Sequence, residues 1–448
     1  MSAAYPLLCQ PQQNVLFRLP DYDVAGDDFL RAAHRVADTL PDAGFVINAC
    51  QHRLWFTVAF AAALLRNQVT LLCSDRSPEQ LRALADQYPR LHLVTDDPRD
   101  DCPVPRTVLT PFPLSASSAS LAMPSIAADT LAAIVFTSGS TGSPVPHRKT
   151  WGMLVERSID AAACFDFTQD RPSNVVGMVP AQHMYGFETT VLLPLHVPVA
   201  TWCDVAFYPQ DVATALRSVP EPRVLVTTPL QIGTLLRASI DLPPLHRIIS
   251  ATAPLARDVA EAAERQWDTQ VHEIFGATEV GSIASRRTTQ DDVWQTYPHV
   301  RLAQLGPAED QSVAVSAPFA APYPLNDLVE QLDDRRFRLL GRRADMIKLG
   351  GRRASLSDLN RILNGIDGVI DGQFVAPSDL DTQPNARLQV FAVAPERDAN
   401  DILAELRRRI DPLFLPRRVI LVDRLPRNDT GKLTEAAIAA LQATQPDR

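Results

Sequence analysis

Residues 131–144 read LAAIVFTSGSTGSP, and the interpretation of the whole chain starts from this stretch. Its apolar first half predicts a buried strand, and the strand runs directly into hydroxyl residues and glycines at positions 137–142. Glycine lets a backbone approach a ligand closely, and consecutive N–H groups beside hydroxyls form a nest for anions. The stretch therefore predicts a polyphosphate-binding loop, with a flexible Ser/Gly loop as the alternative. It is not a Walker A loop, because no Gly-Lys-Ser/Thr follows.

Short apolar strands alternate with helices on both sides of this loop. We predict strands at residues 44–48, 69–73, 91–95, 131–136, 174–179, 224–227 and 247–250. We predict helices at residues 54–65, 78–87 (with Ser77 as N-cap), 149–164, 257–267 and 433–441, and a connection at 111–129. This βαβ rhythm indicates an α/β fold with mainly parallel sheets and helices on their faces.

The chain has 448 residues, which is more than one hydrophobic core usually takes. From about residue 342 the sequence becomes arginine-rich and then alternates small strands with helices. We therefore predict two domains. Residues 1–341 form a large N-terminal domain of βαβ subdomains, and residues 342–448 form a small α+β C-terminal domain.

Composition and charge argue against several classes of protein. The net charge of −9 disfavours a nucleic-acid partner, and none of the six cysteines forms a CxxC pair, so a reducing compartment fits best. The longest apolar run, residues 54–65, is too short to span a bilayer, and the N-terminus lacks the pattern of a secretory signal. These features predict a cytoplasmic protein without membrane insertion.

Three further segments carry residue types that suit nucleotide chemistry. Residues 274–279 read IFGATE and combine an aromatic ring for adenine, a hydroxyl for phosphate and a carboxylate for Mg²⁺. Residues 341–351 read GRRADMIKLGG, and residues 425–432 read LPRNDTGK, which sets a lysine on a glycine turn. Each segment alone also fits an ordinary turn or a solvated surface.

Together, in this order and at these separations, the four segments resemble the adenylate-forming superfamily of acyl-CoA synthetases, nonribosomal adenylation domains and luciferases. The resemblance covers roughly residues 131–432. It implies an active site between the large domain and a mobile C-terminal domain. It also implies ATP and Mg²⁺ as cofactors, and an acyl-adenylate that is passed to a thiol.

By matching position, the resemblance places the ATP phosphates on Thr137, Ser138, Gly139, Ser140, Thr141 and Gly142. Phe275 would stack on adenine, Thr278 would touch phosphate, and Glu279, with Thr141, would hold Mg²⁺. The remaining nucleotide contacts that it implies are Lys149, Ala251, Thr252, Ala253, Gly276 and Leu339, together with Asp327 and Arg342 at the ribose.

Lys432 matches the family's catalytic lysine, which bridges the carboxylate and the α-phosphate during adenylation. A carboxylate that attacks the α-phosphorus brings two anions together, so cations must offset the repulsion as charge builds. Rotation of the C-terminal domain about residues 342–345 would then withdraw Lys432 and admit the thiol. His183, within residues 180–186, matches the family's substrate segment and is a further catalytic candidate at the pocket mouth.

The chain departs from the family pattern at three places. Val145 stands where a lysine usually follows the proline of the phosphate loop, and Lys149 or Arg148 is the candidate replacement. Ala344 occupies the hinge position, where the family commonly has Asp or Lys. Residues 251–252 read Ala-Thr where the family usually has Gly-Gly.

Basic residues crowd the C-terminal part of this acidic chain. They are Arg335, Arg336, Arg338, Arg342, Arg343, Lys348, Arg352, Arg353, Arg407, Arg408, Arg409, Arg417 and Arg418. The functional interpretation is a docking surface for an acidic acyl carrier protein that brings the thiol. A smaller patch for the phosphates of coenzyme A and a solvated basic face are the alternatives.

The short length and the phosphate-loop variant look similar to ligases from xanthomonadin and aryl polyene pigment clusters. That resemblance implies an aromatic substrate, 3- or 4-hydroxybenzoate, loaded onto a carrier protein. It predicts a flat, mostly apolar pocket, to which we assign His183, Tyr185, Gly186, Phe187 and Ala277. Tyr185 and Phe187 fit core positions equally well. Outside the ligases, a nucleotide-binding module without catalysis and a nucleic-acid-binding protein are the competing hypotheses.

Overall fold

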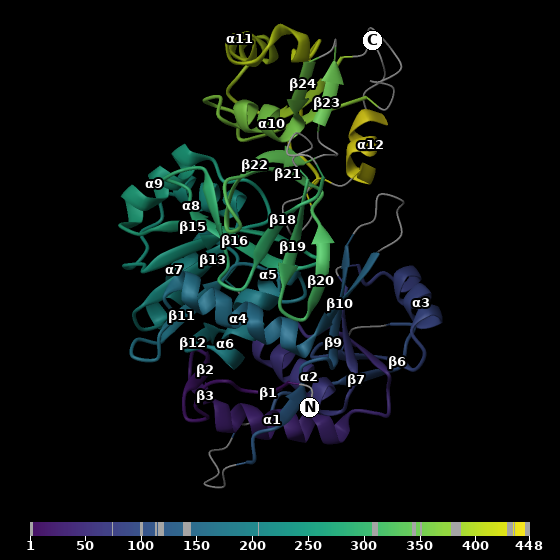
Figure 1. The fold of residues 1–448 in the computed structure, drawn as a ribbon. Helices are drawn as coiled ribbons and strands as arrows, with labels where there is room; N and C mark the ends of the chain where they lie inside the picture. The colour runs from purple at the N-terminus through teal and green to yellow at the C-terminus, as the bar shows by residue number, and fades with distance from the viewer. Residues whose placement is uncertain are drawn as a thin grey trace.

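The structure is a computed structural model that describes residues 3–73, 75–98, 102–112, 114, 121–137, 145–204, 206–306, 312–342, 346–349, 352–377, 387–427, 433 and 435–443. Residues 138–144 of the predicted phosphate loop, the hinge residues 343–345 and Lys432 lie outside the described residues. Figure 1 shows a large body that carries most of the chain and, above it, the smaller group of elements from β23 to α12.

The first sheet has six strands in the order β10-β9-β5-β4-β6-β7. Its strands are β4 (Phe45–Asn48), β5 (Val69–Leu72), β6 (Leu91–Thr95), β7 (Arg106–Val108), β9 (Leu131–Thr137) and β10 (Val145–Thr150). All neighbours pair in parallel except β9 and β10, which form an antiparallel hairpin. Helix α3 (Pro78–Gln87) begins at the predicted N-cap, because the Ser77 hydroxyl accepts from the Gln80 N–H.

The second sheet has eleven strands in the order β21-β22-β17-β16-β15-β14-β13-β11-β12-β2-β3. They are β2 (Val15–Arg18), β3 (Asp23–Ala25), β11 (Ser173–Gly177), β12 (Val199–Trp202), β13 (Arg223–Thr227), β14 (Arg247–Ser250), β15 (Val271–Ala277), β16 (Gly281–Arg287), β17 (Val293–Thr296), β21 (Asp327–Gln331) and β22 (Arg336–Arg342). From β15 to β2 the strands are parallel, and β15 to β21 pair antiparallel. The prediction of mainly parallel sheets is therefore refined: this sheet is mixed.

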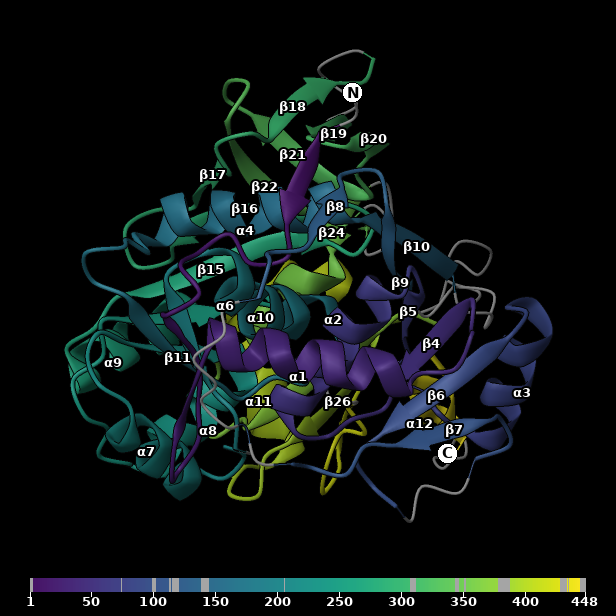
Figure 2. The same cartoon turned by 90° about the horizontal axis from the view of Figure 1, so that it is seen from below.

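Buried helices lie between the two sheets. They are α1 (Gly26–Thr39), α2 (Arg53–Leu65), α4 (Trp151–Phe165) and the short run α5 (Met184–Gly186), η1 (Phe187–Leu192, a π-helix) and α6 (Leu193–His196). One apolar core cluster joins these helices to strands of both sheets, which explains why α2 is apolar along its whole length. Figure 2 shows α1 crossing the underside, between β4, β6 and β7 on one side and α7–α9 on the other.

The outer helices of the second sheet are α7 (Pro209–Ser218), α8 (Pro229–Arg237) and α9 (Arg257–Trp267). Two smaller sheets complete this part of the chain: β1 (Ala4–Pro6) with β8 (Ser125–Ala127), and β18 (Arg301–Gln304), β19 (Val313–Ala317) and β20 (Ala320–Pro324). None of the helices in the described ranges combines the length and the apolar character needed to cross a bilayer.

The C-terminal elements form sheets of their own. They are β23 (Met346–Leu349), β24 (Arg352–Ser355), α10 (Leu356–Asn364), β25 (Asp371–Val375), β26 (Gln389–Val393), α11 (Ala399–Arg409), β27 (Val419–Leu421) and α12 (Glu435–Ala443). Strand β22, which ends at Arg342, still belongs to the large sheet, whereas β23 pairs only with β24 among the described strands. The fold is thus a large α/β domain followed by a smaller C-terminal domain.

Several predicted boundaries shift by one or two residues in the structure, and two predicted segments contain a strand that was not expected. The helix expected from residue 149 begins at Trp151, because Val145–Thr150 pairs with β9 as strand β10 and Thr150 caps the helix by accepting from the Met153 N–H. The connection expected at 111–129 contains strand β8. Both strands are polar or very short, so they lack the apolar alternation on which the prediction relied.

Candidate active site

The predicted phosphate loop connects the two strands of the β9–β10 hairpin. Thr137, the last residue of β9, pairs with Val145, the first residue of β10. Along β10 the side chains alternate between the two faces, so Arg148 is exposed and Lys149 is completely buried. The two candidate replacements for the missing loop lysine therefore point to opposite sides of the strand.

The segment with Phe275 and Glu279 forms the end of β15 and the turn into β16. Phe275, Gly276 and Ala277 are strand residues, and Thr278 and Glu279 lie in the turn. A bulge interrupts the β15–β16 pairing at Phe275 and Gly276, where a Cβ on Gly276 would come within 2.8 Å of the Gly281 carbonyl oxygen. The bulge thus turns the end of the strand out of the regular ladder.

Phe275 is held by two other aromatic rings. Its ring centroid lies 5.8 Å from that of Trp294 on β17 and 5.8 Å from that of Phe337 on β22. Tilted and edge-to-face contacts of this kind are favourable between aromatic rings. Since Phe275 remains partly exposed, the packing fixes the ring and leaves some of it accessible.

Lys149 contacts the turn that carries Glu279. Its ammonium donates a hydrogen bond of 2.8 Å to the Glu279 backbone carbonyl, although the two residues are 130 positions apart. Burial lowers the pKa of Lys149 to about 8, against the opposing effect of the Glu188 and Glu279 carboxylates. The hairpin of the predicted phosphate loop and the Glu279 turn are therefore directly connected.

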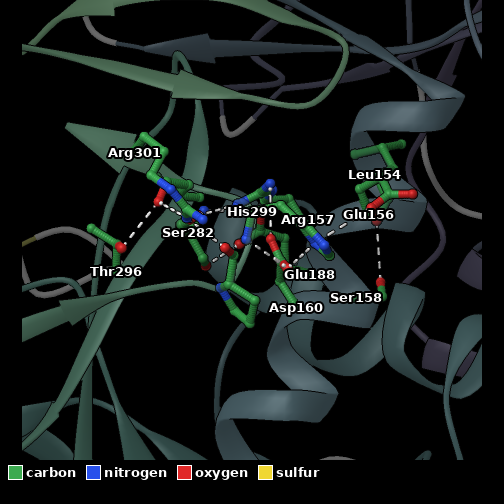
Figure 3. Close-up of polar contacts among 12 residues, drawn as sticks. Leu154, Glu156, Arg157, Ser158, Asp160, Glu188, Ser282, Thr296, His299 and Arg301 are labelled. Carbon is green, nitrogen blue, oxygen red and sulfur yellow. Dashed lines mark hydrogen bonds and ion pairs between the residues drawn. The ribbon is translucent and has the colours of Figure 1, made fainter. Parts of the chain in front are cut away.

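Two more buried charged residues hold Ser282, near the start of β16, on the other side of this turn. The Glu188 carboxylate on η1 accepts from the Ser282 backbone N–H at 3.2 Å and from its hydroxyl. Arg157 on α4 donates to the Ser282 carbonyl at 3.3 Å. Figure 3 shows these side chains meeting, with Asp160 and His299 beside them.

The same cluster continues to the next strand connection. Arg157 forms an ion pair of 3.0 Å with Asp160, one turn along α4, and Asp160 contacts His299 Nδ1 at 2.7 Å. Burial raises the pKa of Glu188, while the Ser282 groups and the neighbouring cations oppose that rise. Sequence analysis missed Arg157 and Glu188. Glu188 is the one charged residue in η1, which was an available signal, whereas Arg157 is one of three charged residues in α4 and did not stand out.

The substrate segment lies across the ends of β13 and β14. The Tyr185 hydroxyl is 2.9 Å from the Ile249 carbonyl oxygen and 3.1 Å from that of Thr227, and it donates to them. Phe187 is fully buried, with its ring edge-to-face on Phe60 of α2. Phe187 therefore occupies a core position, and Tyr185 fixes the segment that begins at His183.

Residues 251–253 follow β14 and pass beside the end of β15. Thr252 has a φ of 81°, in the left-handed region where glycine is the favoured residue. Its hydroxyl oxygen is buried without a hydrogen-bond partner among the described residues, and Ala253 is exposed. The segment is anchored downstream, where the Leu255 N–H donates to Glu273 Oε1 at 2.8 Å.

The two residues predicted at the ribose are direct neighbours. Asp327 at the start of β21 pairs with Arg342 at the end of β22, and Leu339 lies two positions further along the same ladder. This register brings all three residues to the edge of the large sheet next to the C-terminal domain.

The described ends of the Lys432 segment are held together. Arg427 and Leu433 form an antiparallel bridge, and residues 428–432 between them lie outside the described residues. Arg427 also forms an ion pair with Asp371 on β25, at 2.7 Å. Arg427, which precedes the predicted Lys432 segment, is thus anchored on the C-terminal domain.

Part of the arginine-rich stretch is neutralised within the fold. Arg336 pairs with Asp333, and Arg338 pairs with both Asp292 and Glu330. All of these residues belong to the large domain. In the small domain, Arg408 and Arg409 share Glu405.

The family model of the AMP-binding enzymes matches residues 33–315, and the chain belongs to this family. It is 28% identical to the 4-coumarate–CoA ligase of Rhodobacter capsulatus over 241 residues, which are 54% of this chain and 59% of that protein. It is 26% identical to the L-proline–[L-prolyl-carrier protein] ligase of Pseudomonas fluorescens over 357 residues, 69% of this chain and 68% of that protein.

Solved structures show the same architecture. The o-succinylbenzoate coenzyme A synthetase of Bacillus subtilis, in complex with ATP and magnesium ion, superimposes with a TM-score of 0.79. The comparison covers 96% of this chain and 98% of that one at 16% sequence identity, so it establishes the fold. The family model identifies the chain as an AMP-binding enzyme, and the structural comparison shows that it has the fold of the o-succinylbenzoate coenzyme A synthetase.

Proposed function

We propose that this enzyme activates a carboxylic acid with ATP, forms an acyl-adenylate with release of pyrophosphate, and transfers the acyl group to a thiol. The observation that carries the proposal is the hydrogen bond from Lys149 to the Glu279 carbonyl, since it joins the β9–β10 hairpin to the Glu279 turn. The proposed phosphate-binding and metal-binding segments are therefore neighbours, as a bound ATP–metal complex requires.

The residues present fit a magnesium ion at Glu279. Its carboxylate is partly exposed at the turn, and the ion pairs found among the described residues do not include it. Mg²⁺ prefers carboxylate oxygens together with phosphates and water, and Thr141 would add a hydroxyl. When bound, the metal supplies positive charge against the phosphates.

The protein's own groups would bind and orient the reactants. Phe275, already fixed by Trp294 and Phe337, offers a ring face to adenine. Asp327 and Arg342, paired across β21 and β22, would hold the ribose. Lys432, carried by the small domain, would offset the repulsion between the attacking carboxylate and the α-phosphate.

The acid that we propose is aromatic, with 3- or 4-hydroxybenzoate as the leading candidates. The 4-coumarate ligase among the relatives acts on an aromatic acid, which supports this class. The acid would lie near His183, Gly186 and Ala277, with residues 251–253 as one wall. The fully buried Phe187 would contribute only by shaping the segment from within the core.

An acyl carrier protein is the acceptor that we propose, and the prolyl-carrier protein ligase supports it. The coenzyme A ligase from Rhodobacter capsulatus supports the alternative acceptor, coenzyme A. Because Arg336 and Arg338 are paired within the large domain, carrier docking would depend on the remaining basic residues of the small domain.

Two assays in sequence test the proposal. Purified enzyme with ATP, Mg²⁺ and a panel of benzoates, cinnamates and aliphatic acids is assayed for pyrophosphate release, with hydroxylamine to trap the acyl-adenylate. We expect hydroxybenzoates to give the highest turnover. The best acid is then offered with phosphopantetheinylated carrier protein or with coenzyme A, and acyl transfer is measured by mass spectrometry. Preference for coenzyme A would replace the carrier protein as acceptor, and preference for an aliphatic acid would reject the aromatic class.

A further inference from the structure

Three buried charged side chains from three separate elements converge on one turn. Lys149 on β10 is 0% exposed, Arg157 on α4 is 4% exposed and Glu188 on η1 is 8% exposed. Lys149 donates to the Glu279 carbonyl, and the other two contact the backbone of Ser282. The turn between these points contains Glu279 itself.

This number of buried charges needs an explanation beyond stability. Burying an ion costs several kcal/mol of solvation, and apolar side chains of similar volume often give a fold at least as stable. Here each of the three charged side chains forms a hydrogen bond with a backbone group of residue 279 or 282. The N–H, the hydroxyl and the carbonyl of Ser282 all take part in these hydrogen bonds. The charges therefore fix the position of one short backbone segment from several directions.

Gly281 shows how closely the segment is fitted. Its φ is 94°, and a Cβ at this position would lie 2.5 Å from Glu188 Oε1. The backbone thus passes directly over the carboxylate, with no space for a side chain between them. A displacement of the turn would break these contacts together.

We propose that Lys149, Arg157 and Glu188 are positioning residues that hold the Glu279 turn in the geometry that binds Mg²⁺. The inference rests on the proposed function, in which Glu279 is the metal ligand. Lys149 acts here from beneath the turn, on a backbone carbonyl.

Lys149 could act by positioning the Glu279 turn or by contacting the phosphates, and these two roles predict different effects on ATP binding. A positioning residue affects ATP binding only when the metal is present, because it acts through Glu279. A phosphate contact affects ATP binding with or without metal. Outer residues that orient metal ligands typically change metal affinity about 10-fold to 100-fold when they are replaced.

The test uses Lys149→Met, which keeps most of the length of the side chain and removes its charge and donor. Calorimetry measures the affinity for ATP in excess Mg²⁺ and in EDTA, and pyrophosphate exchange measures the Mg²⁺ concentration at half-maximal rate. We expect Lys149→Met to weaken MgATP binding about 10-fold and to raise the Mg²⁺ requirement by a similar factor. Affinity for metal-free ATP should stay within about twofold of the wild-type value.

Arg287→Met is the matched control. Arg287 lies on β16, the strand that also carries Ser282, at the end away from the turn. It forms a partly buried ion pair of 2.8 Å with Glu264. This variant should lose stability and keep the wild-type Mg²⁺ requirement. If Lys149→Met does not fold, Glu188→Gln and Glu188→Leu replace it: the amide, which still accepts from Ser282, should retain more Mg²⁺ affinity than the leucine.

Equal weakening with and without Mg²⁺ would overturn the inference in favour of a phosphate contact, and an unchanged Mg²⁺ requirement would overturn it outright. Neither result affects the proposed function, provided that the wild-type enzyme forms an adenylate. A wild-type enzyme that forms no adenylate with any acid contradicts the proposed function instead.

Discussion

Thr252 stands where the family usually has glycine, and its backbone has the left-handed conformation that glycine adopts most readily. A β-branched residue at a φ of 81° is strained, and in the part of the chain that the structure describes the hydroxyl oxygen is buried without a hydrogen-bond partner. The family usually has glycine at this position, which matches the backbone conformation that the structure requires. The sequence revealed the departure, but only the backbone shows that it costs stability.

Replacement of Thr252 by glycine should therefore stabilise the fold. Relief of strain and removal of the buried hydroxyl outweigh the greater entropy of glycine in the unfolded chain, and we expect a gain of about 1 kcal/mol. Urea denaturation of wild type, Thr252→Gly and Thr252→Ala measures this. Alanine keeps the strain and should recover only part of the gain, and a less stable glycine variant would contradict this account of residue 252.

Helix α6 packs against α4 through a buried histidine. His196 is 3% exposed, its Nδ1 lies 2.9 Å from the Ser158 hydroxyl oxygen, and its ring meets Trp151 edge-to-face at 4.9 Å. Burial lowers the pKa of His196 to about 3, so the folded protein keeps this ring neutral.

This packing predicts a loss of stability in mild acid. The unfolded chain binds a proton at His196 below a pH of about 6.5, whereas the folded chain does so only near pH 3, so unfolding is favoured as the pH falls between these values. Between pH 6.5 and 4.5 the contribution is about 2 kcal/mol. His196→Gln should flatten that part of the stability curve in urea titrations; an unaltered curve would mean that His196 is accessible to protons.

Elements with strong local signals were predicted to the residue. Strands β6 and β14 and helices α3 and α9 have the boundaries that apolar runs and the Ser77 cap indicated. Strand β10 was missed, because the sequence VPHRKT is polar and becomes a strand only by pairing with β9. Local pattern cannot report such a tertiary effect.

The candidate site was predictable only in part for the same reason. Motif resemblance placed Glu279 and Phe275, and both lie at the end of one strand beside the β9–β10 hairpin. The contacts of Lys149 and Glu188 join residues 130 and 94 positions apart, and only the packing of three elements creates them. A charged residue within an apolar run can be noticed in the sequence. The backbone groups that Lys149 and Glu188 contact cannot be predicted from it.

In the proposed mechanism, the small domain must bring Lys432 to the large domain. Arg427 and Leu433, which flank Lys432 in the sequence, belong to the small domain, whereas Glu279, Phe275 and Asp327 belong to the large domain. Catalysis of adenylation would therefore depend on the two domains meeting in one orientation.

Lys432→Ala should lower the rate of adenylate formation about 100-fold or more, since it removes the cation offered to the reacting anions. The fold and the affinity for MgATP should remain, because the proposed ATP-binding residues of the large domain are untouched. Stopped-flow adenylation and calorimetry with MgATP check the two expectations separately. Full adenylation by the variant would remove Lys432 from the mechanism.

The most direct measurement of the central claim is the trapping of an acyl-adenylate by hydroxylamine, with purified enzyme, ATP, Mg²⁺ and a panel of organic acids. We expect hydroxamate to form only when Mg²⁺ is present, and pyrophosphate to be released in equal amount. The highest yield should come from a hydroxybenzoate. If every acid in the panel gives neither hydroxamate nor pyrophosphate, the claim that this enzyme forms acyl-adenylates is contradicted.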